Sequence, residues 1–113
     1  MSLHCLHTTT RDGVPVVVET GWDDAFRGFA LHVDPQIDPA DKADSPYRFS
    51  NLDQLPGVPL EKGYVDLHFH LGRLGIKLPD EMLSALLKDQ RLGSRNMRVL
   101  WDRDGTVRDI RSW

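Results

Sequence analysis

The sequence predicts an α+β fold in which an antiparallel sheet, made of an N-terminal three-strand meander and a C-terminal hairpin, is covered by a two-helix hairpin. Three observations predict it. Val- and Thr-rich segments precede residue 34, apolar residues recur at helical spacing within residues 60–92, and strand-like alternation returns near the C-terminus. The 113 residues are expected to form a single domain with one modest core.

The N-terminal segment is expected to form three strands. Residues 3–9 and 14–20 favour two of them, because both are rich in β-branched residues and Arg11-Asp12-Gly13 between them is typical of a hairpin turn. Residues 21–24 are expected to turn the chain, and residues 26–33 to form the third strand. Three large side chains of that strand alternate onto one face: Phe29, Leu31 and Val33.

A Pro- and Asp-rich surface loop is expected at about 34–58. Five of the seven prolines lie between residues 34 and 59, and residues 47–50 are expected to form a short edge strand. The first half of the loop, residues 35–45, has little to bury and is expected to be mobile. Its four carboxylates lack the alternate spacing and the glycine of a calcium loop, so a solvated loop is the better interpretation. They are Asp34, Asp38, Asp41 and Asp44.

Residues 60–92 are expected to form two helices joined by a turn at 75–79. Gly75 suits the left-handed conformation that ends a helix, with Ile76 folding back onto the last turn. Pro79 suits the first position of the second helix, where its missing N–H costs nothing. The second helix has one apolar stripe, and its polar residues Lys88, Asp89 and Arg91 fall mostly off it. The stripe consists of Met82, Leu83, Leu86 and Leu87.

The first of these helices has an alternative. Residues 64–71 also alternate apolar and polar side chains, as a strand does. The helix is favoured, because a stop at Gly75 followed by a short turn is expected only after a helix. In the helix, Val65 and Phe69 form a second apolar patch away from the main stripe. A helix that is apolar on two sides is usually covered on both.

The C-terminal segment is expected to form a hairpin. Residues 97–101 favour a strand, Asp104-Gly105 a turn, and residues 106–113 the returning strand. Met97, Val99 and Trp101 would share one face of the first of these strands.

The composition is that of a soluble globular protein, with 40% hydrophobic and 27% charged residues. No apolar run approaches the ~20 residues that span a bilayer, and no signal-peptide segment follows Met1. We therefore expect the protein in the cytoplasm. Cys5 is the single cysteine and cannot form an internal disulfide, which agrees with a reducing compartment.

Four short motifs occur in order along the chain: Gly21-Trp22-Asp23, Ser50-Asn51-Leu52-Asp53, Leu74-Gly75-Ile76 and Leu78-Pro79. On these motifs the sequence resembles a group of short uncharacterised proteobacterial proteins, over most of its length. The group has no assigned activity, cofactor or site residues. The resemblance therefore implies a bacterial protein and carries no catalytic residue with it.

The histidines are the first candidates for chemistry. Cys5 and His7 would share a face of a strand, and so would His68 and His70, as a metal site requires. In a helix the last two point roughly 200° apart and cannot hold one ion. The chain has no C-x-x-C or H-E-x-x-H spacing, no phosphate-binding loop and no nucleophile elbow. We therefore expect no bound metal, no cofactor and no enzymatic activity.

The charge is unevenly distributed. Residues 1–87 contain 13 acidic and 7 basic residues, whereas residues 88–113 contain 4 acidic and 7 basic ones. Arginines interleaved with Trp101 and Trp113 are typical of nucleic-acid binding, which is the alternative function. Four aspartates among them and a pI of about 5.9 argue against it. The candidate contacts are Arg95, Arg98, Arg103, Arg108 and Arg111.

The favoured function is a non-enzymatic protein-binding or assembly module. Its candidate interface residues are Val65, Phe69 and Trp22, because aromatic residues are enriched at protein interfaces. A second copy of the chain would cover the Val65 and Phe69 patch across a two-fold axis, so a homodimer is expected. Two alternatives remain open. Trp22 and Trp101 would simply fill the small core, or loop residues of the same chain would cover the patch, namely Tyr47, Phe49 and Leu52.

Overall fold

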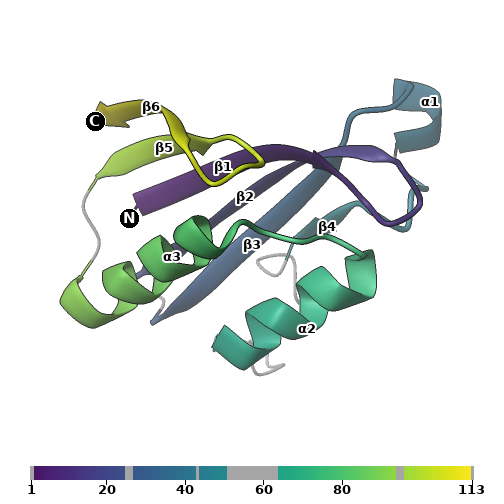
Figure 1. The fold of residues 1–113 in the computed structure, drawn as a ribbon. Helices are drawn as coiled ribbons and strands as arrows, with labels where there is room; N and C mark the ends of the chain where they lie inside the picture. Colours follow the sequence, from purple (N-terminus) through teal and green to yellow (C-terminus); the bar gives the residue numbers. More distant parts are fainter. Residues whose placement is uncertain (1, 25–26, 43, 51–63, 94–95, 113) are drawn as a thin grey trace.

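The computed structural model describes residues 2–24, 27–42, 44–50, 64–93 and 96–112, with the backbone alone for 64–66. The elements are, in chain order, β1 (Ser2–Thr9), β2 (Pro15–Asp23), β3 (Gly28–Pro35), α1 (Pro39–Lys42), β4 (Phe49–Ser50), α2 (Tyr64–Leu74), α3 (Asp80–Leu92), β5 (Met97–Trp101) and β6 (Val107–Ser112). Figure 1 shows α2 and α3 on the same face of the sheet. Among the described helices, none combines the length and the apolar character needed to cross a membrane.

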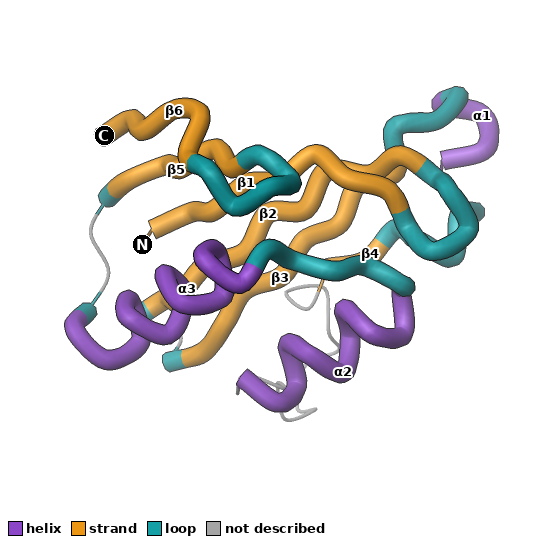
Figure 2. Tube along the Cα trace, viewed as in Figure 1, coloured by secondary structure: helices purple, strands orange, loops and turns teal. Residues whose placement is uncertain are grey.

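The strands lie in the order β4-β3-β2-β1-β5-β6 (Figure 2). β1, β2 and β3 form the expected antiparallel meander, in which His4 lies opposite Thr20 and Thr20 opposite Leu31. β5 and β6 form the expected hairpin. The expectation of a wholly antiparallel sheet is wrong at one pairing, because β5 runs parallel to β1, with Cys5 opposite Leu100.

The parallel pairing follows from the connection that leads to β5. A tight hairpin forces two strands to run antiparallel, whereas a long connection through helices allows a strand to return in parallel. Here the chain passes over the sheet through α2 and α3 before β5 joins β1 on the side opposite β2. The local sequence of β5 contains no sign of this direction.

The two helices cover different strands. α2 packs on β3, while α3 packs on β1 and β2, and the segment 75–79 connects them (Figure 1). The α+β class and a mostly antiparallel sheet of six strands, counted over the described residues, are thus confirmed. The expected arrangement of meander, hairpin and two-helix cover is matched in part.

The core lies between the sheet and the two helices. Its strand residues alternate onto the helix-facing side of the sheet, as the period of a strand requires. Phe29, Leu31 and Val33 are buried there, as expected. The buried cluster comprises Leu6, Val16, Val18, Phe29, Leu31, Val33, Leu67, Leu71, Leu74, Ile76, Leu78, Met82, Leu86, Val99 and Trp101.

Residues 64–71 are helical, so the strand alternative for this segment is wrong. The helix ends as expected at Gly75, which has φ +70°. The N–H of Ile76 donates to the carbonyl of Leu71 at 2.9 Å, and that of Gly75 to the carbonyl of Gly72 at 3.2 Å. These two bonds form a Schellman motif, which satisfies carbonyls that the helix end would otherwise leave without a donor.

α3 differs from its prediction at its start and on its buried face. It begins at Asp80, and Pro79 is the N-cap residue with ψ 145°. Met82 and Leu86 are fully buried, but Leu87, expected in the stripe, is 40% exposed. Asp89 was expected mostly off the stripe, yet it lies three residues after Leu86 and faces the sheet.

The turn predicted at residues 21–24 begins later than expected. β2 continues through Asp23, which pairs with Gly28 of β3. Trp22 packs edge-on against Phe29, with ring centroids 5.2 Å apart, and this contact extends the ladder. Gly21 lies where the backbones of β1 and β2 approach closely, since an added Cβ would collide with the carbonyl of Ser2. A glycine inside a strand often marks such an approach.

The segment expected as a surface loop contains two short elements. α1 is capped by the Asp38 side chain, which accepts from the N–H of Ala40 at 2.9 Å, and Lys42 pairs with Asp34 at 2.9 Å. β4 pairs with His32 and Val33 of β3, so the predicted edge strand is present, but two residues long. Residues 51–58 of this segment, including Leu52, lie outside the described residues.

Candidate functional site

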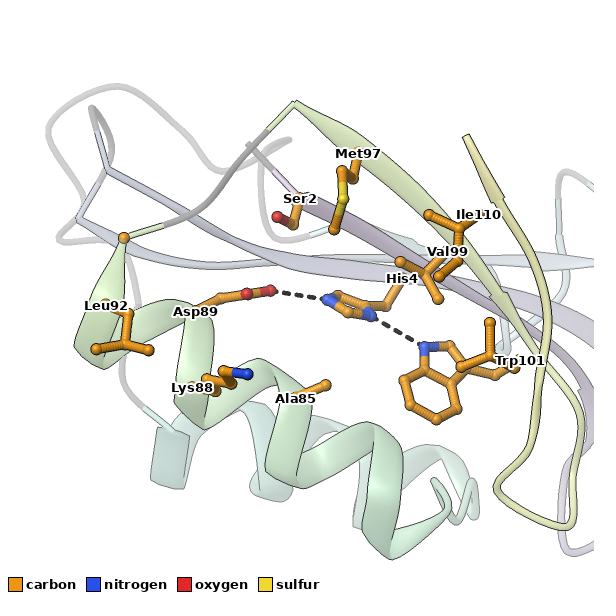
Figure 3. Close-up of a pocket in the computed structure, with 12 residues that line it drawn as sticks. Ser2, His4, Ala85, Lys88, Asp89, Leu92, Met97, Val99, Trp101 and Ile110 are labelled. Carbon is orange, nitrogen blue, oxygen red and sulfur yellow. Dashed lines mark hydrogen bonds and ion pairs between the residues drawn. The ribbon is translucent and has the colours of Figure 1, made fainter. Parts of the chain in front are cut away.

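A cavity of about 360 Å³ lies between α3 and the strands β1, β5 and β6 (Figure 3). We call it the α3–β6 groove. Three of its polar lining residues are His4, Lys88 and Asp89, and its larger apolar ones are Leu92, Met97, Val99, Trp101, Val107 and Ile110. The groove forms because β5 and β6 lie beside β1, while α3 packs over β1 and β2.

His4 forms a buried polar chain on one wall of the groove. Its Nε2 lies 2.8 Å from Oδ2 of Asp89, and its Nδ1 accepts a hydrogen bond from the indole N–H of Trp101 at 2.9 Å (Figure 3). Because an indole N–H can only donate, Nδ1 carries the lone pair and the neutral ring carries its proton on Nε2. Two residues far from His4 in sequence, Asp89 and Trp101, therefore fix one tautomer of its ring.

This arrangement bears on catalysis, because Ser2 also lines the groove and a Ser-His-Asp set is a common nucleophilic site. In that mechanism one imidazole nitrogen contacts the carboxylate and the other takes the proton of the serine. In this chain the second nitrogen already accepts from Trp101. The set consequently has the geometry of a structural network, which satisfies buried polar groups under the groove.

The rim of the groove is apolar and exposed. Leu92 is 66% exposed, Ile110 56% and Val107 44%. Ile110 lies opposite Val99 and Val107 opposite Trp101, so both belong to the helix-facing side of the sheet. Among the described strands, β6 is also an outermost one of the sheet. An apolar rim beside an outer strand is suited to binding another protein segment.

The predicted interface residues lie on different elements, with Val65 and Phe69 on α2 and Trp22 on β2. Phe69 on α2 is 61% exposed, as its position away from the main stripe predicts. The side chain of Val65 lies outside the described residues. Trp22 is half-buried against the core, and its indole N–H donates to Asp24 at 2.7 Å. Trp101 is buried in the core, as its alternative interpretation expected.

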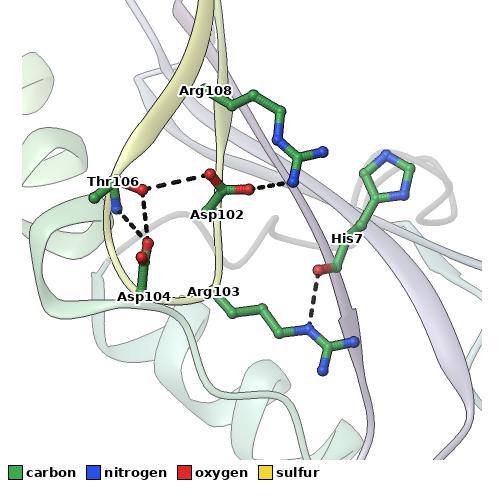
Figure 4. A network of polar contacts seen from close by, with 6 residues as sticks. All are labelled: His7, Asp102, Arg103, Asp104, Thr106 and Arg108. Carbon is green, nitrogen blue, oxygen red and sulfur yellow. Dashed lines mark hydrogen bonds and ion pairs between the residues drawn. The ribbon is translucent and has the colours of Figure 1, made fainter.

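Four of the predicted nucleic-acid contacts are described, and each has a polar partner. Figure 4 shows Arg103 and Arg108 with theirs. Arg108 pairs with Asp102 at 2.5 Å and Arg111 with Asp109 at 2.9 Å, while Arg98 lies 3.6 Å from Glu19. The Nε of Arg103 donates to the carbonyl of His7 at 3.4 Å. Nearby carboxylates reduce the positive potential that a phosphate backbone would meet. Arg95 lies outside the described residues.

The histidine and cysteine pairs do not assemble a metal site among the described residues, where no group of three or more His, Cys, Asp or Glu side chains is placed to hold an ion. His68 is exposed and His70 buried, as opposite sides of a helix require. Cys5 is buried, and burial raises the pKa of its thiol, against the opposing effect of Arg98. A buried thiol with a raised pKa is a poor nucleophile.

Two features of the sequence indicate buried polar residues of the groove, although neither residue was among the predicted site residues. Asp89 follows Met82 by seven residues and Leu86 by three, which places it on the buried face of a helix. His4 alternates with Leu6 in a strand, so the two share a face. The exposure of Ile110 and Val107 had no signal, because it depends on where β6 lies in the sheet.

The comparisons with known proteins add no further assignment. No protein-family model, no curated protein and no solved structure matches this chain. A function is therefore argued from the site alone.

Proposed function

We propose that this chain is a small assembly module without catalytic activity, and that it forms a homodimer through the α3–β6 groove and the outer edge of β6. The observation that carries the proposal is the exposure of Leu92, Val107 and Ile110 around one groove. Val107 and Ile110 belong to the face of the sheet that α2 and α3 cover elsewhere, and Leu92 is the last residue of α3.

Three large apolar side chains at the rim of the groove are partly exposed. Burying a large apolar side chain is worth roughly 1.5–3 kcal/mol, whereas a domain of this size is stable by only about 5–15 kcal/mol. Leu92, Val107 and Ile110 are about half exposed, so each forgoes part of this stabilisation. A partner that covers Leu92, Val107 and Ile110 recovers it.

The outer edge of β6 offers backbone hydrogen-bonding groups to a partner. An outermost strand presents N–H and C=O groups that face away from its one neighbour, and these groups template the addition of another strand. β6 is six residues long and pairs on one side with β5. The opposite outermost strand, β4, is two residues long and offers a much shorter template.

Phe69 provides the competing surface. It is exposed on α2, close to His70, with ring centroids 5.4 Å apart, and His70 in turn lies 4.6 Å from Phe49. This surface presents the exposed aromatic side chain of Phe69 on a helix, and the outer strand near it, β4, is two residues long. The α3–β6 groove combines apolar exposure with backbone groups, so it is the favoured interface.

The experiment compares two matched variants, Ile110→Asp and Phe69→Asp, by multi-angle light scattering over a range of protein concentrations. We expect a dimer for the unchanged protein and for Phe69→Asp, and a monomer for Ile110→Asp. Both residues are more than half exposed, so both variants should remain folded, which circular dichroism checks. If only Phe69→Asp dissociates the dimer, the interface lies on α2. If the unchanged protein is a monomer at high micromolar concentration, the proposal is wrong.

A further inference from the structure

Resting on the proposed function, we infer that the second copy adds antiparallel to β6 in one register, in which Ile110 lies opposite Ile110 of the other copy. The two sheets then continue into one another across the two-fold axis. This register determines which residues of the two copies meet and which charges lie opposite each other.

Symmetry limits the possibilities first. Two copies of an edge strand that are related by a two-fold axis perpendicular to the sheet run antiparallel and keep the same faces. The helices of both copies consequently lie on the same side of the continuous sheet. Because side chains alternate with period two, only registers that keep equivalent faces together are allowed.

The charges of β6 then select among these registers. Asp109 and Arg111 flank Ile110 on either side. With the axis at Ile110, Asp109 lies opposite Arg111 of the other copy, and the same pair repeats across the axis. With the axis moved by one residue, either Asp109 meets Asp109 or Arg111 meets Arg111. Like charges directly opposite each other destabilise an antiparallel pair, so the register at Ile110 is favoured.

The charged side chains of Asp109 and Arg111 are accessible to the other copy. Arg111 and Asp109 pair within one copy at 2.9 Å, and their side chains are 79% and 46% exposed. An exposed pair of this kind contributes little to stability, so changing partner costs little. Its value lies in specifying register, because mismatched arrangements bring like charges together.

The apolar residues agree with the same register. Ile110 lies on the helix-facing side, opposite Val99, and is 56% exposed in one copy. Placing two copies of it side by side at the axis removes both from water. The floor of each α3–β6 groove is then extended by the strand of the other copy, on the side where the rim residues Val107 and Leu92 lie.

The first test is a disulfide. In Cys5→Ala protein, Ile110→Cys is compared with Val107→Cys under mild oxidation at low micromolar concentration. Residues opposite each other in an antiparallel pair have Cα atoms about 4.5–5.5 Å apart, within the range that a disulfide spans. We expect a covalent dimer from Ile110→Cys and little from Val107→Cys, which lies on the same strand three residues from the axis.

The second test is a charge exchange, read as the dimer dissociation constant by sedimentation. Asp109→Arg and Arg111→Asp should each weaken the dimer about tenfold, because each creates two like-charge pairs across the axis. The double variant should return to within about threefold of the unchanged protein. Its thermal stability at low concentration serves as the folding control, since the exchange keeps the pair within one copy.

The outcomes separate the two proposals. A dimer that gives no disulfide at residue 110 and no recovery in the double charge variant overturns this register, while assembly through another contact stands. A protein that is monomeric at high micromolar concentration overturns assembly and register together.

Discussion

At His4, two neighbours decide which ring nitrogen carries the proton. Trp101 can only donate to Nδ1, and Asp89 can only accept from Nε2 while it is ionised. If Nδ1 also carried a proton, its N–H would face the indole N–H of Trp101, and neither group could accept a hydrogen bond from the other. His4 lies next to a half-buried carboxylate but serves a structural role, as its second neighbour, Trp101, indicates.

Removing the acceptor should therefore destabilise the fold. In Asp89→Ala the buried Nε2–H of His4 loses its partner, and we expect the free energy of unfolding to fall by about 1–3 kcal/mol. Asp89→Asn should cost less, because its amide oxygen still accepts. Lys88→Ala, the adjacent exposed position on α3, serves as control and should lie within about 0.5 kcal/mol of the unchanged protein. Urea titrations measure all three, and equal effects at 88 and 89 would contradict the network.

Asp104 carries a pH effect in the turn before β6. Hydrogen bonds from the Thr106 hydroxyl at 2.7 Å and from its N–H at 3.0 Å hold the pKa of Asp104 below its ordinary value (Figure 4). A lowered folded-state pKa means that this contribution to stability is present above the unfolded pKa, near 4, and is lost as the pH falls through the folded value.

The corresponding variant is Asp104→Asn, which can still accept these hydrogen bonds but cannot be protonated in this range. We expect the difference in unfolding free energy between pH 7 and roughly pH 3 to shrink in Asp104→Asn. Urea titrations at the two pH values measure this difference, and carbon NMR follows the Asp104 carboxyl directly. A carboxyl that titrates at or above its ordinary pKa would contradict the assignment.

At the scale of elements, the end of α2 depends on one backbone conformation. Gly75 has φ +70°, and a Cβ there would also come within 2.9 Å of the Arg11 side chain in the β1–β2 turn. Gly75→Ala should therefore lower stability by about 1–2 kcal/mol. Gly72 is the matched control, because it is exposed inside the same helix with open space around it.

For Gly72→Ala the expected change has the opposite sign. Alanine loses less backbone entropy in a helix than glycine, so the variant should gain about 0.5–1 kcal/mol. Thermal and chemical unfolding of the two variants, side by side, provide the measurement. If both variants change the free energy of unfolding in the same direction, the left-handed conformation is not the reason why position 75 requires glycine.

At the scale of the whole molecule, the charge distribution predicts weak binding to nucleic acid. The net charge is −3, and the described arginines of the C-terminal hairpin lie beside carboxylates or a carbonyl. We expect no anisotropy change with labelled random duplex or single strands at about 0.15 M salt. A change that declines steeply with salt and is lost in Arg108→Ala would instead favour the alternative function.

The sequence by itself determined the parts of the fold that depend on neighbours along the chain. Alternation located the strands, the spacing of apolar residues located α3, and Gly75 located the end of α2. The helix at 64–71 was chosen over a strand for a reason that lies outside the segment, the turn that follows it. Each of these features depends on local sterics and on which face of the element is buried. The period of the apolar residues and the identity of the turn residues reflect both.

Tertiary structure decided the contacts between segments distant in sequence. The parallel pairing of β1 with β5 depends on the path over the sheet, and the His4 chain joins residues 85 and 97 positions apart. The exposure of Ile110 depends on β6 being outermost. An alternating strand has the same pattern in the centre of a sheet as at its edge, because alternation records two faces but not the number of neighbours. For that reason the candidate interface emerged only with the order of the strands.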